Sequence, residues 1–127
     1  MVKTFNKVAG VVLLVVGLAG FAMPNLLGMH LTPVHNIIHL LTAALALYMG
    51  FAGSLDAART FSIAFGAVYL LLGVLGFVAP GVVTAVIGHP PAPAGELTPD
   101  NAVHLLLGAA FLAVGLMQSR SVTTRTA

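Results

Sequence analysis

Two stretches of sequence carry most of the information about the architecture: residues 31–50, LTPVHNIIHLLTAALALYMG, and residues 97–115, LTPDNAVHLLLGAAFLAVG. Each begins with Leu-Thr-Pro, carries Asn and His three residues apart, and continues after the histidine into an apolar run. Thr followed by Pro is typical of a helix start, where threonine caps the helix and proline takes its first position. We therefore predict helices that begin at Pro33 and Pro99, with Thr32 and Thr98 as their N-caps.

Two further apolar runs, residues 8–27 and 60–83, complete a set of four with residues 33–53 and 99–117. At 1.5 Å per residue, each run is long enough to cross about 30 Å of hydrocarbon. The chain is 59% hydrophobic and 6% charged, a composition that a water-soluble domain of this size cannot carry on its surface. The sequence predicts an all-α fold, a bundle of four transmembrane helices that forms a single integral membrane domain over residues 1–127.

The basic residues predict the orientation of these helices. They precede the first run, separate the second from the third, or follow the fourth, at Lys3, Lys7, Arg59, Arg120 and Arg125. The other two loops, about residues 30–32 and 88–98, carry no Lys or Arg, so the positive-inside rule places both termini in the cytoplasm. A cleaved signal peptide is the alternative for the first run, since lysines precede it and small residues follow it.

An internal repeat argues against that alternative. In the first and third runs, Gly10, Gly17, Gly20, Phe21 and Pro24 recur 56 residues later as Gly66, Gly73, Gly76, Phe77 and Pro80. In the second and fourth runs, Asn36 and His39 recur 65 residues later as Asn101 and His104. We predict two tandem two-helix repeats, about 8–53 and 60–118, related by a pseudo-twofold axis along the membrane normal. Pro24 and Pro80 are expected to kink or end their helices, and the insertion in loop 88–98 is typical of a stiff connector.

The repeated glycines predict close helix packing. Small residues on one face of a membrane helix allow the backbone of a neighbour to approach closely. We assign this packing role to Gly10, Gly17, Gly20, Gly66, Gly73 and Gly76.

The repeated Asn-x-x-His motif leaves three hypotheses open. The first is structural: Asn36, Asn101, His39 and His104 hydrogen-bond neighbouring helices or loops. The second is that His39 and His104 ligate a b-type haem from two facing helices, with the asparagines as polar partners that orient the rings. No metal ligand set is assigned from the motif itself.

The third hypothesis is a polar pocket at the outer end of the bundle, for a metal ion, a proton or a lipid headgroup. It draws on His30, His35, His89, Glu96 and Asp100. The three histidines of this group have no histidine counterpart in the other half of the chain.

Several classes of function are disfavoured. The chain has no cysteine, which excludes disulfides and thiolate metal sites, and its few scattered basic residues do not form a nucleic-acid surface. No Gly-x-Ser-x-Gly, His-Glu-x-x-His or phosphate-binding glycine loop is present, so we expect no enzyme. Ion-coupled transporters usually carry a carboxylate inside the membrane, and the four predicted membrane cores contain none.

The repeated Asn-x-x-His-Leu-Leu, with Gly-x-x-Gly-Phe-x-x-Pro in the first and third helices, resembles a family of small bacterial four-helix membrane proteins that is a domain of unknown function. The resemblance covers nearly the whole chain. It implies the four-helix architecture and the bacterial inner membrane, and it implies no activity, substrate or cofactor. The chain departs from the family pattern at Ala43, where the second copy has Gly108.

The first functional hypothesis is therefore a non-enzymatic structural or accessory membrane protein. Such a protein would pack through its glycine-lined faces against itself, against lipid, as a homo-oligomer or within a larger membrane complex. A haem- or tetrapyrrole-binding protein that uses His39 and His104 is the alternative, and a small transporter is the second alternative.

Overall fold

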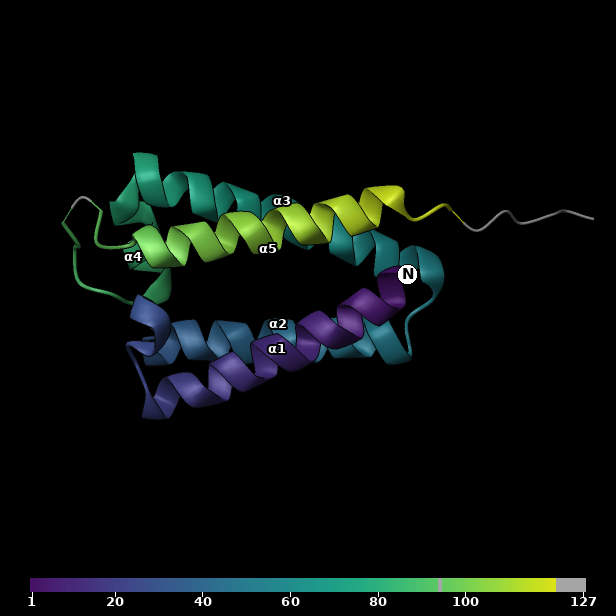
Figure 1. Ribbon diagram of the computed structural model, residues 1–127, viewed down its shortest axis with the longest axis horizontal. Helices are drawn as coiled ribbons and strands as arrows, with labels where there is room; N and C mark the ends of the chain where they lie inside the picture. The colour runs from purple at the N-terminus through teal and green to yellow at the C-terminus, as the bar shows by residue number, and fades with distance from the viewer. Residues whose placement is uncertain (94, 121–127) are drawn as a thin grey trace, which may run out of the picture.

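The structure, a computed structural model, describes residues 1–93 and 95–120. Helices are the regular elements of this part, with no strand among these residues. The described residues form five α-helices, labelled in Figure 1, with a short 3-10 turn, η1, between the first two. Their bounds are α1 Val2–Ala22, η1 Leu26–Gly28, α2 Pro33–Phe51, α3 Leu55–Val78, α4 Pro80–Ile87 and α5 Thr98–Met117.

Four of the helices, α1, α2, α3 and α5, are long and apolar enough to cross a membrane, with lengths of 19 to 24 residues. In a helix every backbone polar group inside the span is bonded within the same segment, which is what the hydrocarbon phase requires. Their outward faces expose large apolar side chains to the surroundings, such as Val15, Leu41, Leu71 and Leu106. The chain is a multi-pass membrane protein, as the sequence predicts.

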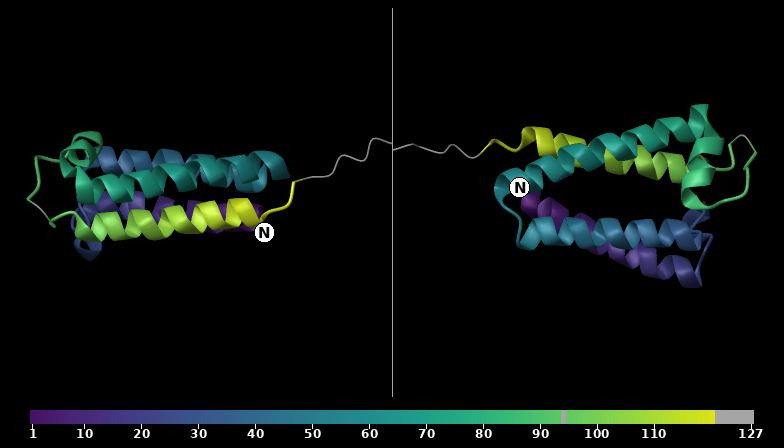
Figure 2. Two further views of the ribbon diagram at one scale, coloured as in Figure 1. Left: turned by 90° about the horizontal axis from the view of Figure 1, so that it is seen from above. Right: turned by 180° about the vertical axis from the view of Figure 1, so that it is seen from behind.

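The four long helices form two antiparallel pairs, α1 with α2 and α3 with α5, which lie side by side in Figures 1 and 2. The pairs meet at the end of the bundle that carries the N-terminus, which we call the terminal end. There Ser62 Oγ donates a hydrogen bond to Asn6 Oδ1 at 2.8 Å, and Asn6 Nδ2 donates to the carbonyl of Ala58 at 3.2 Å. A buried apolar cluster lies next to these bonds, formed by Ala9, Ala46, Phe61 and Phe111.

Glycines set how closely the two helices of each pair approach. A Cβ at Gly20 would overlap the side-chain amide of Asn36, and a Cβ at Gly76 would overlap that of Asn101. A Cβ at Gly66 would lie 2.5 Å from the backbone nitrogen of Leu112, well inside van der Waals contact. The glycine faces of α1 and α3 are therefore occupied by α2 and α5 of the same chain.

Two prolines end the first and third helices. The residue before each proline leaves the helical region, with φ −131° and ψ 75° at Met23 and φ −146° and ψ 61° at Ala79. This follows from the clash between the proline ring and the preceding residue. The predicted spans 8–27 and 60–83 therefore extend too far at their C-terminal ends, since α1 ends at Ala22 and α3 at Val78. After Pro80 the chain forms α4, a short helix that the sequence analysis did not predict.

The two Leu-Thr-Pro segments start their helices differently. Thr32 is the N-cap of α2 as predicted, since its side chain accepts a hydrogen bond from the backbone N–H of His35 at 3.1 Å. The prediction for Thr98 was wrong: Leu97 is the N-cap of α5, and Thr98 is the first helical residue. The cause is one missing residue, because Pro33 is three residues before its Asn and Pro99 only two. Thr98 therefore takes the helical position that Pro33 takes in α2.

Candidate functional site

Three buried histidines meet between the two helix pairs, in the half of the bundle opposite the terminal end. His35 and His39 lie one turn apart on α2, and His104 faces them from α5. One ring nitrogen of each lies within 4.8 Å of the others, and the three side chains are only 3 to 6% exposed. The ring centroids of His35 and His39 are 4.3 Å apart, and those of His35 and His104 are 5.7 Å apart. We call this group the inner triad.

A hydrogen bond shows which nitrogen of one ring carries the proton, whereas no hydrogen bond between described residues does so for the other two rings. His35 Nδ1 lies 2.7 Å from the carbonyl oxygen of His30. A carbonyl only accepts, so Nδ1 carries the proton and Nε2 presents its lone pair. His39 Nδ1 and His104 Nδ1 are buried and have no hydrogen-bond partner among the described residues. Buried polar atoms without a partner are uncommon in folded proteins and call for a physical explanation.

Asp100, in the first turn of α5, is the acidic neighbour of the triad. Its side chain is fully buried, and it accepts hydrogen bonds at 2.9 Å from both the backbone N–H and the Nδ1–H of His30. Its Oδ1 also lies 4.0 Å from His35 Nδ1. The sequence analysis found no carboxylate in a membrane core, but the structure buries this one inside the segment Thr98–Met117 that is apolar enough to span a membrane. Asp100 is the third residue of that segment, so its buried carboxyl group lies at the end of the span.

The predicted outer pocket divides into two groups. His35 belongs to the inner triad, whereas His30, His89 and Glu96 form a separate cluster nearer the surface. Asp100 lies between the two groups, hydrogen-bonded to His30 and 4.0 Å from His35 Nδ1. The asparagines take a different place from the one that the haem hypothesis needs. Asn36 Nδ2 donates to the carbonyl of Leu31 at 3.2 Å, and neither asparagine is hydrogen-bonded to a histidine in the described part of the chain.

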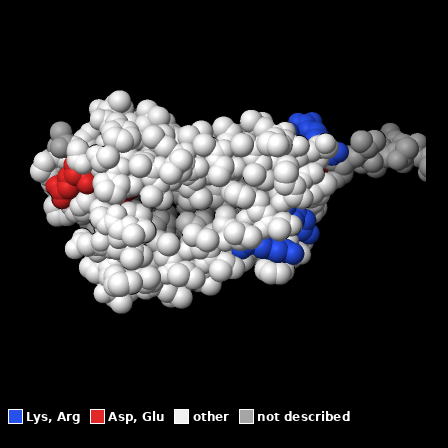
Figure 3. All heavy atoms as spheres, viewed as in Figure 1, with Lys and Arg blue, Asp and Glu red and all other residues white. Residues whose placement is uncertain are grey.

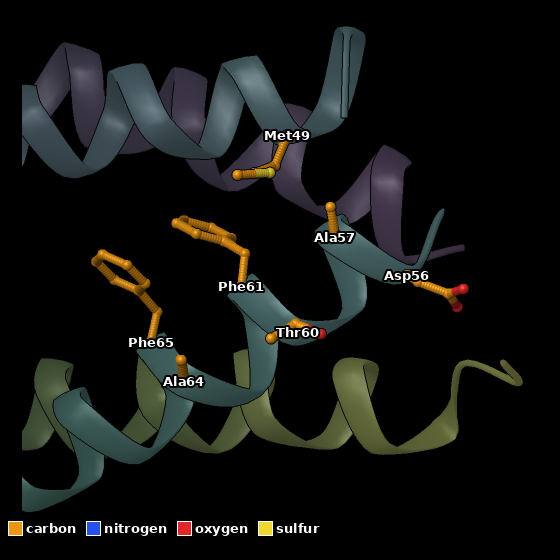
Figure 4. Close-up of a pocket in the computed structure, with 7 residues that line it drawn as sticks. All are labelled: Met49, Asp56, Ala57, Thr60, Phe61, Ala64 and Phe65. Carbon is orange, nitrogen blue, oxygen red and sulfur yellow. The ribbon is translucent and has the colours of Figure 1, made fainter. Parts of the chain in front are cut away.

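The triad borders two small apolar spaces. One, of about 30 Å³, lies on the side that α4 covers and is lined by Tyr69, Val83 and Ile87. The other, of about 190 Å³, lies on the side of α1 and is lined by Val12, Leu27 and Met29. A larger groove of about 490 Å³ lies at the terminal end, where Figure 4 shows Phe61 and Phe65 turned toward α2. That groove has one acidic side chain, Asp56, at its rim, and none of the groups of metal ligands among the described residues lines it.

Sequence reasoning placed His35 and Asp100 in the outer pocket and did not predict that His35 lies beside His39 and His104. Two signals could have indicated their positions. His35 and His39 are four residues apart, so they share one face of a helix. His35 also corresponds to Asp100 at the repeat offset of 65, so the two helices place an imidazole and a carboxyl group at matching positions.

The comparisons with known proteins agree with the resemblance inferred from the repeated motif. The family model of a domain of unknown function, DUF4383, matches residues 3–117. No curated protein and no solved structure matches the chain.

Proposed function

The chain belongs to the DUF4383 family, a domain of unknown function, and from that premise we propose that it is a non-enzymatic membrane protein that binds a divalent transition-metal ion. The ligands are the imidazoles of His35, His39 and His104. The observation that carries this proposal is the approach of three ring nitrogens to within 4.8 Å at a buried position.

The distances suit a small ion. Zinc binds imidazole nitrogen at about 2.0–2.1 Å, so two nitrogens on one tetrahedral ion are about 3.4 Å apart. The ring nitrogens, within 4.8 Å of one another, must therefore move closer by about 1 Å to bind one ion. Small rotations of the three side chains about their χ angles would bring them there. Three histidines are a known ligand set for zinc, and imidazole also suits copper, iron and nickel.

Burial and charge support the same proposal. An ion at the triad would give Nδ1 of His39 or His104 the partner that the protein itself does not provide. The carbonyl of His30 already holds the Nδ1–H of His35, which directs Nε2 to the ion, as the outer bonds of metal-binding histidines usually do. The Asp100 carboxylate, 4.0 Å from His35 Nδ1, adds negative charge beside a cation that has left water.

Haem is less well supported than a metal ion. His39 and His104 do approach each other, as bis-histidine ligation requires, but the neighbouring spaces of about 30 and 190 Å³ are small. Sites for organic ligands usually occupy about 300–1,000 Å³. The ring of His35, 4.3 Å from that of His39, also stands where a macrocycle would lie.

The accessory-subunit hypothesis loses its proposed contact surface. It relied on glycine-lined faces, and those faces already pack within each helix pair. The apolar side chains that remain outside suit lipid as the main surrounding partner. The spaces beside the triad have apolar linings and offer little room for a polar substrate, which favours binding over catalysis.

We also propose that both termini lie in the cytoplasm, in a bacterial inner membrane, and that the two helix pairs are tandem repeats. Figure 3 shows the Lys and Arg atoms of the visible face gathered at the terminal end. Lys3, Lys7, Arg59 and Arg120 all belong to segments at that end, and Arg125 lies outside the described residues. The positive-inside rule then places the triad in the outer half of the membrane.

Zinc binding by the purified chain tests the proposal. The full chain is purified in mild detergent, stripped with a chelator and dialysed against zinc, and bound metal is measured by mass spectrometry. His39→Gln and His104→Gln should each release the zinc of the triad, while Asp56→Asn, which changes a side chain at the terminal end, should leave the zinc content unchanged. Zinc content unchanged in the first two variants would contradict the proposal. A Soret band that vanishes in those variants would favour haem instead.

A further inference from the structure

A second group of ligands lies between the inner triad and the surface. His30, His89 and Glu96 each offer one ligand atom, and these atoms lie within 4.8 Å of one another. The three side chains come from the loop before α2 and the loop between α4 and α5, which the fold brings together at the end opposite the termini. We call this group the outer cluster.

Both histidines of the outer cluster are oriented by an oxygen at Nδ1. Asp100 Oδ2 accepts from His30 Nδ1 at 2.9 Å, and the carbonyl of Pro90 accepts from His89 Nδ1 at 2.6 Å. With Nδ1 protonated, the Nε2 of a neutral ring keeps a lone pair that can bind a cation. A carboxylate or a backbone carbonyl behind a histidine is the usual arrangement in metal sites, because it fixes the ring and makes the other nitrogen more basic.

The position of Glu96 indicates a cation. Its Oε1 lies 3.3 Å from His30 Nε2, and two electron-rich atoms at that distance repel unless a positive charge joins them. Asp100, whose side chain is fully buried, approaches the same ring from the other side. A divalent ion held by the rings and Glu96 would satisfy both carboxylates, and a proton on His30 is the competing explanation.

We propose that His30, His89 and Glu96 form a second divalent metal site, of the two-histidine, one-glutamate type, and that Asp100 links it to the inner triad. Two histidines and a glutamate are an established zinc ligand set that leaves a position for water. Asp100 acts as a positioning residue: it holds the His30 ring and lies 4.0 Å from His35 Nδ1. An ion from the outside would meet the outer cluster first. The link rests on the proposed inner site, whereas the outer cluster stands on its own contacts.

Stoichiometry separates the two sites. In equilibrium dialysis of the full chain against zinc, the wild type should bind about two ions per chain. Glu96→Gln and His89→Gln should each lose the outer ion and keep the triad's. His39→Gln should keep the outer ion, and the double variant Glu96→Gln with His39→Gln should bind none. Asp56→Asn removes a carboxyl group at the terminal end and serves as the matched control, with zinc binding unchanged.

The other possible outcomes show which of the two proposed sites is wrong. One ion that is lost only in His39→Gln would overturn the outer site and leave the proposed function standing. One ion that is lost only in Glu96→Gln or His89→Gln would overturn the inner site. No bound zinc in the wild type would overturn both and leave a proton on His30.

Asp100→Asn tests the link. Mutation of the residue that hydrogen-bonds a metal-binding histidine typically weakens metal affinity about 10–100-fold. The outer zinc should therefore bind more weakly by that factor in Asp100→Asn. Asp100→Glu, which keeps the carboxylate, should recover part of the loss. Unchanged zinc affinity in Asp100→Asn would overturn the positioning role.

Discussion

The pairs α1–α2 and α3–α5 carry the same motif on helices that pack in the same way, yet they differ in closeness and in the structure after the proline. At Gly10 the nearest atom to an added Cβ is the side chain of Leu47 at 2.7 Å, while at the matching Gly66 it is the backbone of Leu112 at 2.5 Å. After Pro24 the chain makes only the short turn η1, and after Pro80 it makes the eight-residue helix α4.

The difference shows how a repeated sequence can build an asymmetric site. His39 and His104 come from matching positions, but α4 covers one side of the triad and leaves about 30 Å³, whereas the side of η1 leaves about 190 Å³. The matching positions of His35 and Asp100 complete the asymmetry, since one half supplies a third ring and the other supplies a carboxyl group.

The largest expected effect concerns packing. Gly66→Ala should destabilise the protein by about 1–3 kcal/mol, as overpacking does, because the backbone of Leu112 cannot move aside. Gly10→Ala should cost less, since the side chain of Leu47 can change its rotamer. Thermal unfolding in detergent measures both, and Gly81→Ala is the control, because nothing lies within 4 Å of an added Cβ there. Equal losses at Gly10 and Gly66 would show that the two pairs are equally close.

A smaller effect is expected at the helix starts. Thr32→Ala should cost about 1 kcal/mol, because Thr32 caps α2 and its hydroxyl also donates to the carbonyl of Ile87. Thr98→Ala should change the free energy of unfolding by less than about 0.5 kcal/mol, as exposed positions without such contacts usually do. Within the described part of the chain, its hydroxyl donates to the nearby carbonyl of Gly95, at an exposed position. A similar loss for both threonines in chemical denaturation would contradict the assignment of Leu97 as the cap of α5.

The smallest expected effect concerns the prolines. Pro24→Ala and Pro80→Ala should each cost about 0.4–1 kcal/mol, because the unfolded chain regains backbone freedom. Only Pro80→Ala should also weaken zinc binding by the triad, since a longer α3 would draw α4 away from the rings. Zinc titration of the two variants compares them directly. Weaker zinc binding in Pro24→Ala alone would reverse the roles assigned to η1 and α4.

The sequence predicted the helical membrane fold well and the site only in part. Long apolar runs and helix-breaking prolines are local properties, so the four spans and the change of backbone before Pro24 and Pro80 could be inferred directly. The prediction of Thr98 as an N-cap was wrong, because a shift of one residue in the sequence changes which residue caps the helix. The helix α4 was not predicted, because the apolar run 60–83 continues through Pro80 with no change in hydropathy.

Sequence alone was enough to predict that the chain crosses a membrane, which residues recur, and that His39 and His104 occupy matching positions of the repeated motif, because length, hydropathy and spacing are properties of single helices. Tertiary packing was needed to bring His104 beside His35 and His39, to bury Asp100 behind His30, and to gather the outer cluster from two loops. Those contacts join residues up to about seventy positions apart, such as His30 and Asp100 with a separation of 70, and packing between helices sets them.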